Sequence, residues 1–176
     1  LVLVGAGFVA AVATVLMKWL CVQRIKAGEH ELWSAFVWLN ELQDQFVETV
    51  AGPWFLAHTM GTGSLNMFLR ALGAKIGRGA WLDSYWLPEA DLVTIGRGAS
   101  VGPGCVVQTH LFQDRVMSLD TVTISDGATL ASHSVALPAS VIGSTATVGP
   151  GSLVMRGDQV PRNSEWQGNP IEPWKK

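Results

Sequence analysis

Residues 124–160 read ISDGATLASHSVALPASVIGSTATVGPGSLVMRGDQV, and an aliphatic residue recurs at every sixth position of this stretch. A six-residue period is typical of a solenoid in which each short strand stacks on its counterpart one coil earlier. The aliphatic side chain is expected to point inward, a small residue four positions later to pack near a corner, and glycine to permit the turn. The aliphatic positions are Ile124, Leu130, Ala136, Ile142, Val148, Val154 and Val160.

The same period begins well before this stretch. It predicts a mainly β protein, a parallel β-helix of hexapeptide repeats over residues 76–165, followed by a C-terminal tail at 166–176. The earlier aliphatic positions are Ile76, Leu82, Ile95, Val101 and Val107.

Composition narrows the possible partners and cofactors. The 176 residues carry a net charge of −2 with an isoelectric point near 6.1, so a nucleic-acid partner is not expected. Cys21 and Cys105 do not suggest a disulfide, and no Cys/His group has zinc spacing. We therefore expect no metal.

The N-terminal segment is strongly apolar. Residues 1–17 contain no charge, and the apolar run continues to Val22, long enough to cross a bilayer core of roughly 30 Å. We expect a transmembrane helix within residues 1–26. Because Lys18, Arg24 and Lys26 cluster at its C-terminal end, the positive-inside tendency places the β-helix domain in the cytoplasm, at the cell membrane. The first residue is Leu rather than Met, which suggests that the chain is cut from a longer polypeptide.

Residues 27–75 are expected to form a helical connector. An amphipathic helix is predicted over residues 29–50, ended by Gly52-Pro53, and a helical turn from Leu65 to Leu72. Two interpretations of the amphipathic helix remain open: it lies on the membrane surface, or it covers the end of the solenoid and its exposed strand edges. Its polar face carries Glu41, Asp44 and Glu48.

The repeat breaks at two places, and insertions in a solenoid are where function is usually found. One extra residue lies between Leu82 and Ile95, near the sequence PEADL. Eleven additional residues lie between Val107 and Ile124, and they predict a loop insertion over residues 112–123.

His110 stands where this insertion begins. Stacking by one coil brings it close to Glu89 and Asp91, and Asp114 and Arg115 follow on the loop. A histidine beside a carboxylate can act as a general base near neutral pH, but His110 could equally anchor the loop by hydrogen bonds. Two carboxylates without further ligands are a weak metal signal. His133, inside a regular coil, is expected to be a solvent-facing turn residue.

The stretch from Ile76 to Trp174 resembles the hexapeptide-repeat acyltransferases, through Thr109-His110, the insertion, the regular coils and Gly168-Asn169-Pro170. The resemblance implies a left-handed β-helix and assembly as a trimer. It also implies that His110 is the general base that deprotonates the acceptor. The pantetheine arm of the acyl donor would lie in a groove between neighbouring β-helices, with Gly168, Asn169 and Pro170 beside it.

A narrower resemblance covers nearly the whole chain. The order of an apolar span, a Trp-rich helix, GTGSLNMFLRALGAKIG, YWLPEADLVTIG, QTHLFQDRVM and WQGNPIEPW is similar to the C-terminal region of epsilon-poly-L-lysine synthetase-type membrane nonribosomal peptide synthetases. That resemblance implies a condensation-type acyltransferase domain that forms amide bonds from an aminoacyl thioester on a carrier (thiolation) domain. Its partners would be the phosphopantetheine of that carrier, sibling β-helix domains, and an amino-acid or amine acceptor.

Three functions are therefore weighed. The first is the carrier-dependent condensing enzyme, with His110 as base, Asp91 or Glu89 as its orienting or acceptor-binding partner, and Asp114 and Arg115 contacting acceptor or donor. The second is an acetyltransferase that uses free CoA with the same histidine. The third is a non-catalytic scaffold that completes a pseudo-trimer around active sibling domains.

Overall fold

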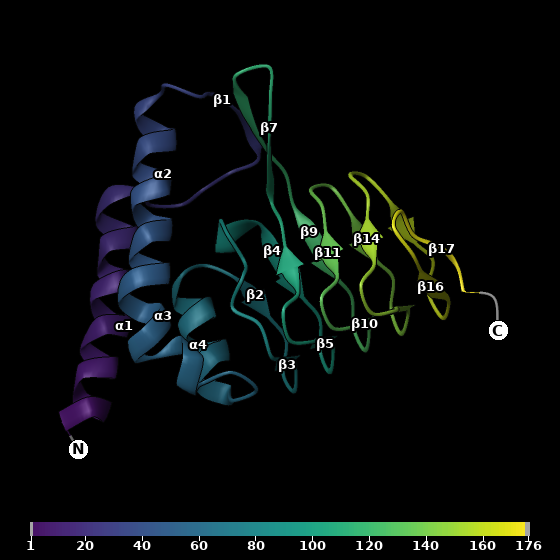
Figure 1. Ribbon diagram of the computed structural model, residues 1–176, viewed down its shortest axis with the longest axis horizontal. Helices are drawn as coiled ribbons and strands as arrows, with labels where there is room; N and C mark the ends of the chain where they lie inside the picture. The colour runs from purple at the N-terminus through teal and green to yellow at the C-terminus, as the bar shows by residue number, and fades with distance from the viewer. Residues whose placement is uncertain (1, 175–176) are drawn as a thin grey trace.

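The computed structural model describes residues 2–174, in which a layer of helices covers one end of a β-helix (Figure 1). Residue 1 of the expected span and residues 175–176 of the expected tail lie outside this part. The coils extend away from the helices, so that the C-terminal strands lie at the far end of the solenoid (Figure 1). The site described below lies near the helical end.

Three parallel sheets form the faces of the prism. Residues of the six-residue period pair with one another across coils: Ile142 lies opposite both Ile124 and Val160. One face contains β2 (Lys75–Ile76), β4 (Val93–Ile95), β9 (Val122–Ile124), β12 (Val141–Ile142) and β15 (Gln159–Val160). A second face contains β3 (Trp81–Leu82), β5 (Ser100–Val101), β10 (Thr129–Leu130), β13 (Thr147–Val148), β16 (Glu165–Gln167) and the antiparallel β17 (Glu172–Pro173). The third contains β6 (Val106–Val107), β11 (Val135–Ala136) and β14 (Leu153–Val154).

The predicted inward and corner positions are confirmed. Leu130 and Ile142 are fully buried, as are Ala128 and Cys105 at small-residue positions. Apolar burial of this kind is the main stabilising contribution to the solenoid.

Glycine has two separate roles in the turns. Gly98 adopts the left-handed region with φ of +63°, which glycine adopts without steric cost. Gly96, beside an aliphatic position, does not have positive φ, but a Cβ on it would lie 2.3 Å from the backbone N of Asp126 on the next coil. The glycines that follow the aliphatic residues therefore allow coils to approach closely, rather than turn the chain as expected.

The helical layer consists of the long helix α1 and five shorter elements, and two of the bounds differ from expectation. The predicted helix over 29–50 begins only at Ala35, because Ser34 caps it and accepts a hydrogen bond from the Val37 N–H. Gly52-Pro53 does not end the helical path, since proline is tolerated in a first helical turn. The elements are α1 (Val2–Cys21), α2 (Ala35–Gln45), the π-helical η1 (Phe46–Ala51), α3 (Gly52–Trp54), η2 (Leu56–His58) and α4 (Gly63–Ala71).

These helices share one hydrophobic core with the first coils. Ala11 of α1, Leu56 of η2 and Leu69 of α4 are buried in the same cluster as Leu82 and Val101 of the solenoid. The helices therefore pack over the end of the solenoid, which was one of the two interpretations of the amphipathic helix.

Helix α1 is long and apolar enough to cross a membrane, judged by length and composition alone. Only 28% of its most apolar 18-residue window is buried inside the protein. Gly7 and Thr14 lie on the face that packs inward, whereas Phe8, Val12 and Leu16 are exposed on the other. The helix therefore combines a packed face with an unpartnered apolar face.

The large insertion is a hairpin rather than an irregular loop. Strands β7 (His110–Gln113) and β8 (Val116–Leu119) pair in antiparallel register, and β1 (Gly28–Glu31) of the N-terminal region adds a third strand beside β8 (Figure 1). Strand β1 occupies residues that the sequence assigned to a helix. The smaller insertion forms the 3-10 turn η3 (Ala90–Leu92).

Candidate active site

His110 is the first residue of β7, at the corner where the chain leaves the third face of the prism. Its Nδ1 lies 2.9 Å from both carboxylate oxygens of Glu89. The histidine side chain is 14% exposed and the Glu89 side chain is fully buried. The insertion near PEADL and the hairpin insertion therefore meet in one histidine–carboxylate pair.

Three side chains satisfy the buried carboxylate of Glu89. Asn40 Nδ2 donates to Oε1 over 2.6 Å, and Thr109 Oγ1 donates to Oε2 over 2.5 Å. His110 supplies the third contact. These hydrogen bonds compensate for the burial of the carboxylate away from water. Glu89 also adopts the left-handed backbone region, with φ of 42°, a conformation that costs a non-glycine residue about 1 kcal/mol or more.

The arrangement fixes the tautomer of His110. In neutral His110, the Nδ1–H group donates a hydrogen bond to the Glu89 carboxylate. The lone pair of Nε2 is then free to accept a proton. Burial lowers the pKa of His110, but the hydrogen bond and the charge of Glu89, together with the charges of Asp44 and Glu41, outweigh it and raise that pKa above its ordinary value. The pair has the geometry of a general base with an orienting carboxylate.

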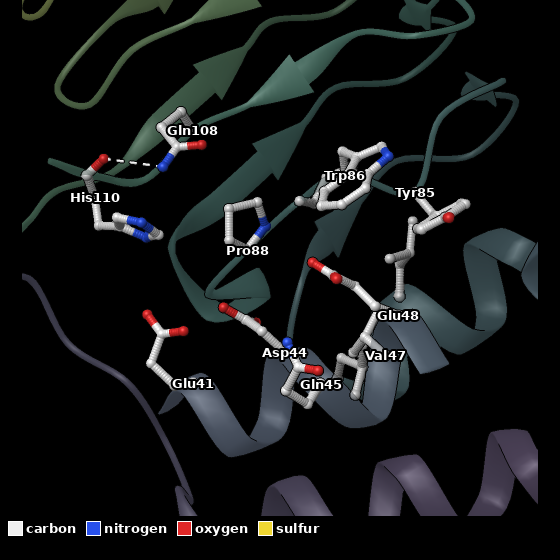
Figure 2. Close-up of a pocket in the computed structure, with 13 residues that line it drawn as sticks. Glu41, Asp44, Gln45, Val47, Glu48, Tyr85, Trp86, Pro88, Gln108 and His110 are labelled. Atoms are coloured by element: carbon white, nitrogen blue, oxygen red, sulfur yellow. Dashed lines mark hydrogen bonds between the residues drawn. The ribbon is translucent and has the colours of Figure 1, made fainter. Parts of the chain in front are cut away.

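A cleft of about 260 Å³ opens beside His110, between the α2–η1 segment and the first coils. In Figure 2, Glu41, Asp44 and Glu48 extend from the helix toward the wall that carries His110 and Pro88. We call these three residues the acidic wall. Tyr85 and Trp86 stack on each other with ring centroids 5.7 Å apart. The lining consists of Glu41, Asp44, Gln45, Val47, Glu48, Leu69, Leu72, Tyr85, Trp86, Leu87, Pro88, Gln108 and His110.

Asp44 is the most perturbed acid of the cleft. Burial, and then the charges of Glu89, Glu41 and Glu48, raise its pKa from 3.8 to about 7, while His110 acts in the opposite direction. Asp44 and His110 therefore titrate as a coupled pair. A cationic amine in the cleft would favour the ionised form of Asp44.

Several residues expected at the site lie elsewhere. The Asp91 carboxylate does not reach His110; it pairs with Lys18 Nζ over 2.7 Å and accepts a hydrogen bond from the backbone N–H of Ile25. The 3-10 turn is the reason, because it points Glu89 and Asp91 in different directions. Asp114 and Arg115 are the two exposed turn residues of the β7–β8 hairpin, both with positive φ, and neither lines the cleft.

The Gly168-Asn169-Pro170 segment lies at the other end of the solenoid, away from the cleft. The backbone N–H of Leu153 donates to the Gly168 carbonyl, so the segment extends the third face, on which β6 leads to His110. Asn169 and Pro170 are exposed. Their contact with a pantetheine arm stays a prediction.

The sequence interpretation missed the residues that the α2–η1 segment contributes. Asn40 and the acidic wall were assigned to an amphipathic helix without a link to His110. The spacing of Glu41, Asp44 and Glu48, at three and four residues, did place them on one helical face. The sequence does not specify that this helical face lies opposite His110.

Within residues 2–174, no group of three or more His, Cys, Asp or Glu side chains is arranged to hold a metal ion.

No protein-family model matches this chain. A curated relative, the delta-poly-L-ornithine synthetase of Acinetobacter baumannii (strain AB307-0294), is 37% identical over 172 residues. The match covers 98% of this chain and 13% of that protein, so the chain spans about one eighth of the relative's length. The name of this relative refers to poly-ornithine, whereas the resemblance seen in the sequence was to poly-lysine synthetases.

Solved structures with a similar fold include acetyltransferases, one of which is described as containing hexapeptide repeats. The acetyltransferase of Vibrio cholerae O1 biovar eltor, in complex with acetyl coenzyme A, aligns with a TM-score of 0.52 and 16% identity, over 62% of this chain and 74% of that one. The serine acetyltransferase of Brucella abortus strain S19, in complex with coenzyme A, has a TM-score of 0.52 and 15% identity, over 93% of this chain and 54% of that one. At these identities the likeness shows the fold: the chain is a hexapeptide-repeat β-helix.

Proposed function

We propose that this chain is an acyltransferase domain that forms an amide bond between an aminoacyl thioester and an amine, with His110 as the general base. The observation that carries the proposal is the His110–Glu89 pair at the edge of an acidic cleft. The 37% identity to a poly-L-ornithine synthetase supports amide chemistry on amino acids, and the fold is one that acetyltransferases use.

The acidic wall suits an amine that arrives as an ammonium ion. Glu41, Asp44 and Glu48 attract the cation, and the stacked Tyr85 and Trp86 offer aromatic surface beside it. The amine must lose its proton before it can attack a carbonyl. His110 Nε2 accepts that proton while Glu89 stabilises the imidazolium.

The bond changes then balance without a covalent enzyme intermediate. The ammonium gives one proton to His110, which releases it to solvent. The neutral amine nitrogen then forms a C–N bond at the thioester carbonyl while His110 accepts the second proton from that nitrogen. The C–S bond breaks, and the thiolate leaves with this second proton from the imidazolium. Among the described residues that line the cleft there is no serine or cysteine to act as a nucleophile, which favours direct attack.

The donor is proposed to be the phosphopantetheine thioester of a carrier domain. Pantetheine supplies the thiol that holds the acyl group as a reactive thioester. The acidic wall repels the phosphates of a nucleotide, so the cleft fits the acceptor, and the donor arm has to reach His110 from outside it. Gly168, Asn169 and Pro170, which extend the third face, are the proposed contacts for that arm. Free CoA remains the second candidate donor, because structures with this fold hold it.

We further propose that α1 tethers the domain to the cell membrane, with the β-helix on the cytoplasmic side. The exposed apolar face of α1 supports a lipid or helix neighbour. Lys18 is buried in its ion pair with Asp91, so Arg24 and Lys26 are the basic residues left exposed at that end. Assembly with sibling β-helix domains as a pseudo-trimer belongs to the same proposal.

The test is an amide-formation assay on the purified chain in detergent. Ornithyl- and lysyl-pantetheine thioesters and acetyl-CoA are each offered with free ornithine, and products are identified by mass spectrometry. The proposal expects dipeptide from an aminoacyl thioester, and His110→Ala as a matched inactive control. Acetyl transfer in place of dipeptide would favour the CoA enzyme. Absence of both products, with the fold intact by circular dichroism, would leave the scaffold.

A further inference from the structure

One three-residue segment, Glu89 to Asp91, is held from both sides by the helical layer. Asn40 of α2 donates to the Glu89 carboxylate over 2.6 Å. Lys18 of α1 pairs with the Asp91 carboxylate over 2.7 Å, which also accepts from the Ile25 N–H over 3.1 Å. The segment that carries the orienting carboxylate is thus fastened to two helices that lie far from it in sequence.

Both contacts are sealed from solvent. Asn40 is 1% exposed, and the Lys18 and Asp91 side chains are 3% and 4% exposed. Water therefore does not compete for these bonds, and each buried group would be left unsatisfied if its partner were removed. Buried groups that are bonded in this way hold a segment in one place.

The segment needs to be held, because its backbone is not in a relaxed conformation. Glu89 has φ of 42° and ψ of 61° and precedes the single turn η3. A glutamate in this region relaxes to a more common conformation unless its surroundings prevent it. Relaxation would move the carboxylate away from His110 Nδ1.

We propose that Asn40 and Lys18 are positioning residues of the active site, which hold Glu89 against His110 through the Glu89–Asp91 segment. The inference rests on the proposed role of His110 as base. It assigns the helical layer, including the apolar helix α1, a part in catalysis beyond anchoring. Neither residue faces the substrate; each acts through the position of Glu89.

The first experiment replaces the amide with a side chain of similar size. Asn40→Leu is expected to lower kcat for dipeptide formation by at least about tenfold, typical of a lost supporting hydrogen bond, with KM for the amine changed less than about twofold. The matched control is Gln43→Leu, because Gln43 is a buried amide of the same helix that makes no hydrogen bond within the described residues. The control is expected to keep the wild-type kcat.

The second measurement reports on the base directly. In ¹⁵N-histidine-labelled protein, wild-type His110 should show a protonated Nδ1 and an unprotonated Nε2 at a pH above its own titration, which the same signals locate, whereas Asn40→Leu should show averaged nitrogen shifts. His110→Gln assigns the signals. This readout needs no turnover, so it tests positioning even if the wild-type chain forms no amide. Wild-type kcat together with wild-type nitrogen shifts in Asn40→Leu would overturn the proposal.

Lys18 is tested with its partner. Lys18→Met leaves a buried, unpaired Asp91 charge and is expected to lower both stability and kcat. Lys18→Met combined with Asp91→Asn removes both charges. The free energy of unfolding should therefore recover, while kcat stays low. Recovery of stability and kcat together would show that Lys18 only stabilises the fold, and would remove it from the proposal.

Discussion

The two ends of the solenoid differ in what they bury. In the regular coils from Ile124 onward, the buried polar side chains are the serines Ser134, Ser140 and Ser152. At the helical end, the protein buries a full ion pair, Lys18–Asp91, and the carboxylate of Glu89. Burial of charge is costly unless it is paired and hydrogen-bonded. The difference teaches that the regular coils act as a stable support and that the irregular end carries the chemistry.

The largest effect is expected from comparing the two histidines in these regions. His110→Gln should lower kcat/KM for amide formation by about 10²- to 10⁴-fold, the usual contribution of a general base. His133→Asn should leave the rate unchanged, because His133 is an exposed turn residue with φ of 58° and asparagine tolerates that conformation. Steady-state kinetics on both variants, with matched circular dichroism spectra, provides the measurement. Equal rates for the two variants would contradict the assignment.

A core substitution in the regular coils should lower stability and leave activity unchanged. Leu130→Ala removes a fully buried side chain and should lower the free energy of unfolding by about 2–5 kcal/mol. Urea denaturation measures it, with the half-exposed Leu42→Ala as a control expected to stay within about 0.5 kcal/mol. Activity per folded molecule should not change. A lower kcat in folded Leu130→Ala would mean that the coils are more than a support.

The pH dependence of kcat/KM tests whether the acidic wall is coupled to His110. His110 must be neutral to accept a proton, so kcat/KM should rise with pH through a His110 pKa above its ordinary value. Asp44→Asn removes one of the charges that raise this pKa, so the acid limb of the profile should move to lower pH. The measurement is the pH at which kcat/KM reaches half of its maximum. The maximum itself is not used, because it also depends on amine binding. A limb that stays in place would show that Asp44 is not coupled to His110.

The same substitution should change stability in a pH-dependent way. The pKa of Asp44 is raised to about 7 in the folded protein, so folding favours its protonated form, and stability is lost as pH rises from about 4 toward 7. Asp44→Asn should therefore stabilise the protein at pH 8 by on the order of 2 kcal/mol, because one pKa unit is about 1.4 kcal/mol and solvent in the cleft screens part of it. Denaturation at pH 4 serves as control, where little gain is expected.

The smallest effect is expected at the hairpin tip. Asp114 and Arg115 both have positive φ, which favours Asn-Gly in a two-residue hairpin turn. Replacing them by Asn and Gly should raise the free energy of unfolding by less than about 1 kcal/mol and leave kcat unchanged. A large loss of activity would return these residues to the site, where the sequence had placed them.

Much of the solenoid could be predicted from local pattern. The spacing of aliphatic residues located the strands because each coil repeats the same local environment, and the two breaks in that spacing marked both insertions. His110 and Glu89 could be paired because adjacent coils stack in a known register. The partner of the Asp91 side chain could not be predicted, because one 3-10 turn rotates that side chain toward α1.

By itself, the sequence determined the repeat, the apolar helix α1 and the histidine at the large insertion, all of which depend on residues close in the chain. Only the tertiary structure decided that α2 faces the cleft, that β1 pairs with β8, and that Asn40 and Lys18 hold the Glu89–Asp91 segment. These contacts join residues that are 49 to 91 positions apart. No periodicity specifies such contacts, because they depend on how the helical layer packs against the end of the solenoid.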